Sequence, residues 1–215
     1  DPGRITTIPL GVSERFYPRP QSECRTALEK NGLSYGGYLL AVATLEPRKN
    51  FTGLLDAFEL LPAPLRQRFP LVVVGGKGWR SHSLERRLER LERSGEVRLL
   101  GYVAAEELPL IYAGARAFAF PSYYEGFGLP PLEAMASGVP VLVADNSAMS
   151  EVVADAGIKV EARDPEAISA GLQRLLLDDD FRAGAVAEGR RRAEIFTWQR
   201  CVEKTIEVYG MVGGH

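Results

Sequence analysis

The chain has 215 residues, of which 46% are hydrophobic and 25% charged, and its formal net charge at pH 7 is −2. These values are those of an ordinary soluble globular protein, with room for one sizeable α/β domain or two very small ones. The nearly neutral charge gives no broad basic field, so we expect no nucleic-acid partner. No apolar run reaches the length of a membrane span, and the N-terminus lacks a signal-peptide pattern.

The chain has two cysteines, Cys24 and Cys201, which are far apart in the sequence. Without a disulfide framework or a metal-ligand spacing, they are typical of a reduced, cytoplasmic protein. We expect both side chains to fill the core.

The first twenty residues contain four prolines and one short apolar run. This composition predicts a linker at residues 1–20 that docks on the edge of a domain formed by residues 21–215. Within the domain, short continuous runs of Val, Leu and Ala predict buried strands. These runs are residues 38–44, 71–75, 97–100, 117–120, 139–144 and 158–160.

Helical patterns alternate with these strands, at residues 51–61, 84–91, 106–113, 132–137 and 149–154. Three further helices are expected at residues 165–177, 180–194 and 198–212. The alternation predicts a Rossmann-like, doubly wound α/β fold with about six parallel strands and extra C-terminal helices.

In such a sheet, ligands bind beyond the carboxyl ends of the strands. Three unusual loops lie there, and the first is EPRKN, in which Arg48 and Lys49 precede Asn50, a plausible helix N-cap. Two cations at a helix N-terminus oppose the helix dipole, but a bound anion would turn this cost into an attraction. A phosphate site is favoured, with a solvated pair of surface cations as the alternative.

A second loop lies in the segment EGFGLPPLE at residues 125–133. Gly126 and Gly128 permit close backbone approach and φ values that other residues avoid. Pro130 and Pro131 suit the first turn of a helix. The backbone amides of residues 126–129 could then point at an anion.

Glu125 and Glu133 stand at the two ends of this segment. An ionised carboxylate accepts two hydrogen bonds, which matches the vicinal hydroxyls of a ribose or a hexose. The alternative is that Glu133 offsets the helix dipole while Glu125 is a solvated loop charge.

The third loop, GGKGWR, lacks the third glycine of a dinucleotide-binding fingerprint and follows the second predicted strand instead of the first. We expect it to be a tight turn, including Gly76, that lines the site. The arginine-rich segment at residues 84–93 has leucines at helical spacing, which predicts an amphipathic surface helix and no nucleic-acid patch.

No metal site is expected. The acidic run 178–180 lies between two predicted helices, where Asp180 is placed to be an N-cap. His82 and His215 are the only histidines and have no evident metal partner. Because the chain also lacks an evident nucleophile and base, it looks like half of an active site.

These motifs resemble a known family. The stretch EGFGLPPLEAMASGVPVL is similar to the E-x7-E segment of the retaining glycosyltransferases of family 4, which have the GT-B fold. Four other stretches also occur in that family's order and spacing, namely LEPRKN, VRLLGYV, FPSYYEGFG and DAG. The resemblance therefore covers essentially the whole chain. It implies the C-terminal, donor-binding half of a GT-B enzyme, with ITTIPLGV similar to the interdomain linker. The acceptor site and a catalytic histidine would belong to an N-terminal domain outside this chain.

The resemblance implies roles for the matching positions. Glu125 would hold the hydroxyls of the transferred sugar, while Lys49, helped by Arg48, would neutralise the leaving diphosphate. Glu133 would hold the ribose, and Tyr102 and Val103 would meet the base through backbone groups. The implied donor-binding set is Glu133, Gly126, Phe127, Gly128, Leu129, Tyr102, Val103 and Gly76.

One departure from the family concerns the stretch after the first strand. Many members carry Gly-Arg or Gly-Gly there, whereas this chain has AVATLE, and we expect Arg48 to take over the phosphate contact. LEPRKN is similar to bacterial mannosyltransferases that build polysaccharides such as O-antigen. We therefore expect GDP-mannose as the donor, a glycan or lipid-linked glycan as the acceptor, and no metal or other cofactor.

The resemblance also implies a cytoplasmic enzyme that associates with the inner face of the membrane through its N-terminal domain. Two other functions stay open. One is a nucleotide-sugar epimerase of GT-B fold, which would need more ionisable groups near the sugar. The other is a non-catalytic nucleotide-binding module.

Overall fold

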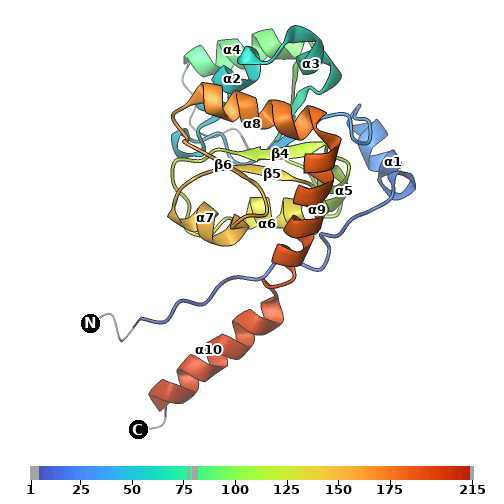
Figure 1. Ribbon diagram of the computed structural model, residues 1–215. Coiled ribbons are helices and arrows are strands. Elements are labelled where there is room, and N and C mark those ends of the chain that lie inside the picture. Colours follow the sequence, from blue (N-terminus) through green and yellow to red (C-terminus); the bar gives the residue numbers. More distant parts are fainter. Residues whose placement is uncertain (1–4, 77, 79–81, 214–215) are drawn as a thin grey trace.

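Six parallel strands form one sheet in the order β3-β2-β1-β4-β5-β6 (Figure 1). The computed structural model describes residues 5–76, 78 and 82–213. The strands are β1 (Leu39–Val42), β2 (Leu71–Val74), β3 (Val97–Gly101), β4 (Ala117–Phe120), β5 (Val141–Ala144) and β6 (Ile158–Val160). This confirms the predicted doubly wound parallel sheet.

Helices connect the strands and extend beyond the last one. They are α1 (Gln21–Lys30), the 3-10 helix η2 (Pro47–Lys49), α2 (Phe51–Leu60), α3 (Ala63–Arg68), α4 (His82–Arg93), α5 (Leu108–Ala113), α6 (Leu129–Ala136), α7 (Ser147–Val153), α8 (Pro165–Leu177), α9 (Asp179–Ala193) and α10 (Trp198–Gly213). The predicted helices are all present, with ends shifted by a few residues.

Two α-helices were not predicted. The buried face of α1 consists of Cys24, Ala27 and Leu28, two of which are only weakly apolar, so its pattern is faint. Helix α3 begins directly after Pro62, with a second proline in its first turn. Prolines close together usually indicate a loop, but the first turn of a helix tolerates them because its amides need no intrahelical partner.

Both faces of the sheet are covered. Alternate strand residues such as Leu40, Val72 and Phe118 pack with α1, α5, α6 and α7 in one apolar cluster. Their neighbours Leu39 and Leu71 pack with α2, α3, α4 and α8 in the other. A strand buried on both faces has no polar side to display, which explains the continuous apolar runs in the sequence.

The N-terminal segment, residues 5–20, passes the junction of α9 and α10 before it reaches α1 (Figure 1). The Val12 amide donates to the Phe196 carbonyl at 2.9 Å. The ring of Phe16 meets that of Tyr112 edge-on at 5.3 Å. These contacts fit the expected docking of the predicted linker.

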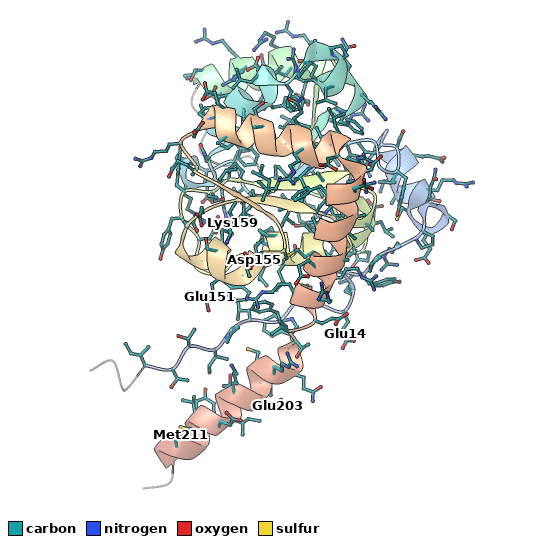
Figure 2. The ribbon with its side chains drawn as sticks, in the orientation of Figure 1. Glu14, Glu151, Asp155, Lys159, Glu203 and Met211 are labelled. Carbon is teal, nitrogen blue, oxygen red and sulfur yellow. The ribbon has the colours of Figure 1, made fainter. Side chains whose placement is uncertain are left out.

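Helix α10 projects away from the sheet, and Figure 2 shows Glu203 and Met211 on it, far from the body of the domain. Its apolar side chains Trp198, Val202, Ile206 and Tyr209 are exposed. No helix within the described part of the chain is long and apolar enough to cross a membrane.

Two expectations are wrong. Helix α9 begins at Asp179, so its N-cap is Asp178 and not Asp180, and the Asp178 carboxylate accepts from the Phe181 amide at 2.9 Å. Asp178 has the extended backbone that lets a capping side chain reach back to the first turn. Cys24 is a core residue as expected, but Cys201 is only partly buried because α10 leaves the domain.

Gly75 and Gly76 provide a matched test of backbone constraint at the end of β2. Gly75 has a φ of +145°, and a Cβ there would lie 2.1 Å from the Ala43 carbonyl oxygen. A Cβ at Gly76 would have no atom within 4 Å. We expect Gly75→Ala to lower the free energy of unfolding by about 2 kcal/mol or more, and Gly76→Ala by less than about 0.5 kcal/mol. Urea denaturation measures both, and equal losses would contradict this account.

Candidate functional site

The sheet has its topological switch point between β1 and β4. The chain leaves β1 for α2 on one face of the sheet and leaves β4 for α6 on the other. The two loops therefore diverge and leave a crevice at the carboxyl ends of the strands, where open α/β sheets bind ligands. The loops EPRKN and SYYEGFGLPP are these two loops.

The structure brings the three predicted catalytic residues together in this crevice. Lys49 Nζ lies 2.6 Å from Glu125 Oε1, and Arg48 Nη1 lies 2.9 Å from Glu125 Oε2. The side chains of Glu125 and Lys49 are only 10% and 11% exposed, whereas Arg48 is half-exposed. Arg48 also bonds Glu46 through Nε at 3.0 Å. The bonds between Glu125 and both cations join the two loops.

The pKa of Arg48 follows from its neighbours. Slight burial lowers it, and the carboxylates of Glu125 and Glu46 raise it by more, so the guanidinium stays charged. Arg48 and Lys49 are thus two cations in the crevice that an anion could bind, and Arg48 is the one that reaches solvent.

Asn50 is the N-cap of α2, as the sequence predicts, because its Oδ1 accepts from the Gly53 amide at 3.2 Å. Asn50 is only 2% exposed. The sequence did not reveal the bonds that its side-chain amide nitrogen makes. Its Nδ2 donates to the carbonyls of Pro121 at 3.0 Å and Ala162 at 2.6 Å. Its φ of 56° is unusual for a residue other than glycine, although asparagine tolerates it.

Asn146, for which the sequence indicated no role, repeats this arrangement on the other side of β4. Its Oδ1 accepts from the Met149 amide at 3.3 Å and caps α7. Its Nδ2 donates to the Ser122 carbonyl at 2.9 Å. A capping asparagine is common, and no local pattern distinguishes one whose amide group also binds a distant loop.

The two glycines of the EGFGLPPLE segment differ in backbone conformation. Gly128 has a φ of +117° at the N-cap of α6, and a Cβ there would lie 2.4 Å from the end of the Met149 side chain. Gly126 does not use the φ freedom of glycine, since its φ is not positive. A Cβ at Gly126 would have no atom within 4 Å. The fold itself therefore does not require a glycine there.

Glu133 lies one turn into α6, as predicted, and is partly buried. Burial raises the pKa of its carboxyl from 4.5 to about 7. The buried Tyr112 hydroxyl, which has no hydrogen bond of ordinary geometry among the described residues, acts on the same carboxyl and lowers its pKa by less. Strongly shifted pKa values gather at functional sites, so this carboxyl is a candidate binding residue.

The other predicted residues lie further along the sheet edge. Tyr102 and Val103 follow β3, two strands from β1, which corresponds to about 10 Å. Tyr102 is 86% exposed, and Val103 packs partly against the core. The Gly76 carbonyl accepts from the Leu45 amide at 3.3 Å, which ties the third loop to the first.

Some predicted features fall outside the described residues. These are Lys77, Trp79 and Arg80 of the GGKGWR loop and His215. Within the described ranges, no group of three or more His, Cys, Asp or Glu side chains could hold a metal ion.

A family profile described as glycosyl transferases group 1 matches residues 28–192. The chain belongs to this family. It is 46% identical over 209 residues to the O-antigen chain mannosyltransferase B of Escherichia coli, with 97% of this chain and 55% of that protein covered. It is 35% identical over 230 residues to a D-inositol 3-phosphate glycosyltransferase of Salinispora arenicola (strain CNS-205), with 98% and 50% covered. This family member thus spans about half the length of both relatives.

Solved structures give the same result for the fold. Sucrose-phosphate synthase of Thermosynechococcus elongatus superposes with a TM-score of 0.80 at 27% identity, over 96% of this chain and 52% of that one. The C-terminal domain of a group 1 glycosyl transferase (LpcC) of Francisella tularensis superposes with a TM-score of 0.70 at 25% identity, over 86% and 96%. The matches confirm the predicted fold of the C-terminal half of a GT-B glycosyltransferase.

Glu133→Gln tests the charge state of the buried carboxyl. Because the pKa of Glu133 rises from 4.5 to about 7 on folding, this carboxyl destabilises the fold once it ionises. The contribution of the protonated carboxyl to the free energy of unfolding is fully present below pH 4.5 and is lost as the pH rises to about 7. Above pH 7 the loss amounts to at most about 3 kcal/mol.

Glutamine is neutral and has the same shape as the protonated side chain. We therefore expect Glu133→Gln to raise the free energy of unfolding at pH 8 and to change it little at pH 4.5, as measured by urea denaturation. Glu29→Gln on α1 removes the same charge from an exposed position and is the control. An equal effect of Glu133→Gln at both pH values would show that folding does not raise the pKa of this carboxyl.

Proposed function

We propose that the chain is the donor-binding domain of a retaining glycosyltransferase that moves mannose from GDP-mannose to a glycan acceptor without a metal ion. The observation that carries this proposal is the joining of Arg48 and Lys49 to Glu125 at the switch point of the sheet. Membership of the group 1 family supports sugar transfer from a nucleotide sugar. The relative named O-antigen chain mannosyltransferase B supports mannose as the transferred sugar.

The two cations would bind the diphosphate of the donor. Without a ligand, the Glu125 carboxylate pairs with both cations, which keeps the nearly buried Lys49 from being an unpaired charge. A diphosphate carries more charge than one carboxylate and would draw Arg48 and Lys49 towards itself. Glu125 would then be free to accept hydrogen bonds from the hydroxyls of the sugar.

Transfer of the sugar leaves negative charge on the departing diphosphate. Cations that are already in place stabilise such charge as it develops, without reorganisation of solvent. Lys49 and Arg48 would supply this stabilisation. The amides of residues 126–129 at the start of α6, with open space around Gly126, would support it for the sugar and the distal phosphate.

The rest of the donor would extend along the sheet edge. Glu133 on α6 would accept hydrogen bonds from the ribose hydroxyls, and Tyr102 and Val103 after β3 would meet the base. The distance of two strands from β1 to β3 is suited to a ligand that reaches from a diphosphate to a base. Gly76 would line the site between them.

The acceptor side would come from an N-terminal domain of the longer protein, since this chain spans about half of its relatives. That domain would bind a glycan or lipid-linked glycan and hold the enzyme at the inner face of the membrane in the cytoplasm. The D-inositol 3-phosphate glycosyltransferase relative leaves the acceptor open to experiment. A panel of nucleotide sugars in calorimetry separates the alternatives: affinity that depends on the sugar supports transfer, and no binding supports a non-catalytic module. Interconversion of the sugars would indicate an epimerase.

The two glutamates should affect binding in different ways. A hydrogen bond to a charged acceptor contributes roughly 1.5–3 kcal/mol, so Glu133→Ala should weaken both GDP and GDP-mannose by about tenfold or more. Glu125→Gln removes the charge that competes for Arg48 and Lys49. It should bind GDP at least as tightly as the wild type and lose about tenfold in the preference for GDP-mannose over GDP. Isothermal titration calorimetry measures all four affinities.

Glu29→Gln serves again as the control, because this exposed glutamate lies on α1, away from the crevice. If Glu125→Gln and Glu133→Ala weaken GDP equally, the assignment of sugar and ribose to the two carboxylates is wrong.

Donor binding should not require a divalent metal. Asp178 caps α9, and Asp179 bonds Arg116 at 2.6 Å, so the acidic run already has structural partners. The affinity for GDP in EDTA and in excess magnesium should differ by less than about twofold once binding of magnesium to free GDP is subtracted. A large gain with magnesium that disappears in Asp178→Ala would overturn metal independence.

A further inference from the structure

We infer that Asn50 and Asn146 are positioning residues that hold the Glu125 loop, defined as residues 121–128, from its two sides. This inference rests on the proposed function for its catalytic meaning, but its geometry stands on its own. Strand β4 lies between β1 and β5 in the sheet. Asn50 follows β1 and Asn146 follows β5, so the two asparagines flank the loop that leaves β4.

The two asparagines bind consecutive carbonyl groups of that loop. Asn50 Nδ2 donates to the Pro121 carbonyl at 3.0 Å, and Asn146 Nδ2 donates to the Ser122 carbonyl at 2.9 Å. The two donors come from the loops after β1 and β5, on the two sides of β4, and Asn146 Nδ2 also lies 3.5 Å from the Tyr123 carbonyl oxygen. The Tyr123 amide then donates to the Arg48 carbonyl at 2.9 Å, which ties the loop to the segment that carries the cations.

Each asparagine is itself fixed by a helix. The Oδ1 atoms accept from the amides of Gly53 in α2 and Met149 in α7. Because the carboxamide is planar, a fixed Oδ1 also fixes the direction of the Nδ2 hydrogens. Asparagine supplies an acceptor and two donors in one short group, which Asp, Ser and Thr do not.

Helix capping alone does not account for this arrangement. Aspartate, serine and threonine cap helices about as well as asparagine. At Asn50 the φ of 56° is a second reason for asparagine, but Asn146 has a φ of −130°, which any residue adopts. At position 146 only the bond to the loop distinguishes asparagine from the other caps.

The consequence concerns the carboxylate that follows. Glu125 is separated from the clamped carbonyls by two residues, and beyond it a Cβ at Gly126 would have no atom within 4 Å. The clamp and the bond from the Tyr123 amide to the Arg48 carbonyl are therefore the backbone constraints nearest to Glu125 on its N-terminal side. A misplacement of about 1 Å in an active site can cost around a hundredfold in rate, so a carboxylate that is to bind the sugar hydroxyls needs a fixed backbone.

Substitution of Asn146 separates clamping from capping. Asn146→Asp and Asn146→Ser both keep the cap of α7 and lose the Nδ2 donor. The aspartate adds a negative charge, and the serine does not. The control is Asn31→Asp at the end of α1, where Nδ2 donates to the Ala27 carbonyl at 2.8 Å. It loses an equivalent bond away from the crevice.

The first measurement needs no ligand. Amide hydrogen exchange at Tyr123, whose amide donates to the Arg48 carbonyl, should become about tenfold faster in both Asn146 variants and stay unchanged in Asn31→Asp. Exchange in the strands should not change in the Asn146 variants. Unchanged exchange at Tyr123, or a uniform rise over the whole chain, overturns the inference.

The second measurement is the affinity for GDP and GDP-mannose. The Asn146 variants should bind GDP within about twofold of the wild type and lose about fivefold in the preference for GDP-mannose. An equal loss for both ligands would mean that Asn146 only stabilises the fold, and overturns its positioning role. If the wild type binds neither ligand, the proposed function fails, while the exchange measurement still decides whether the clamp exists.

Discussion

A carboxylate held between two cations, where water hardly reaches, is the constraint on which the rest of this structure depends. Burial of charge is costly unless the charges are paired, and Glu125 and Lys49 are each almost buried. Neither loop could keep its charge in place alone. The pairing joins the loop after β1 to the loop after β4. An anion that enters the crevice must therefore compete with Glu125 for Arg48 and Lys49.

The order of the strands makes this pairing possible. Residues 49 and 125 are far apart in the chain, yet β1 and β4 are neighbours because the sheet reverses its winding there. The reversal sends α2 and α6 to opposite faces, and their N-termini open towards the same crevice. A long-range ion pair is thus a consequence of topology, and the two capping asparagines secure it with bonds that the topology brings within reach.

Much of the architecture could be predicted from the sequence because its signals are local. Continuous apolar runs marked the strands, and Pro130 and Pro131 marked the first turn of α6. Properties that depend on tertiary contacts could not be predicted. The raised pKa of Glu133 comes from its burial in the folded chain, and the bond from Asn146 to Ser122 joins different loops. The misplaced cap of α9 shows that even a local signal is ambiguous when three aspartates stand in a row.

The pKa of about 7 at Glu133 means that the ligand-free protein is a mixture near neutral pH. The neutral acid and the carboxylate then both occur at this position, in the same fold. A ligand whose hydroxyls donate to Glu133 selects the carboxylate, so its binding expels a fraction of a proton into the buffer. The heat of binding would then contain the ionisation heat of that buffer and vary from one buffer to another.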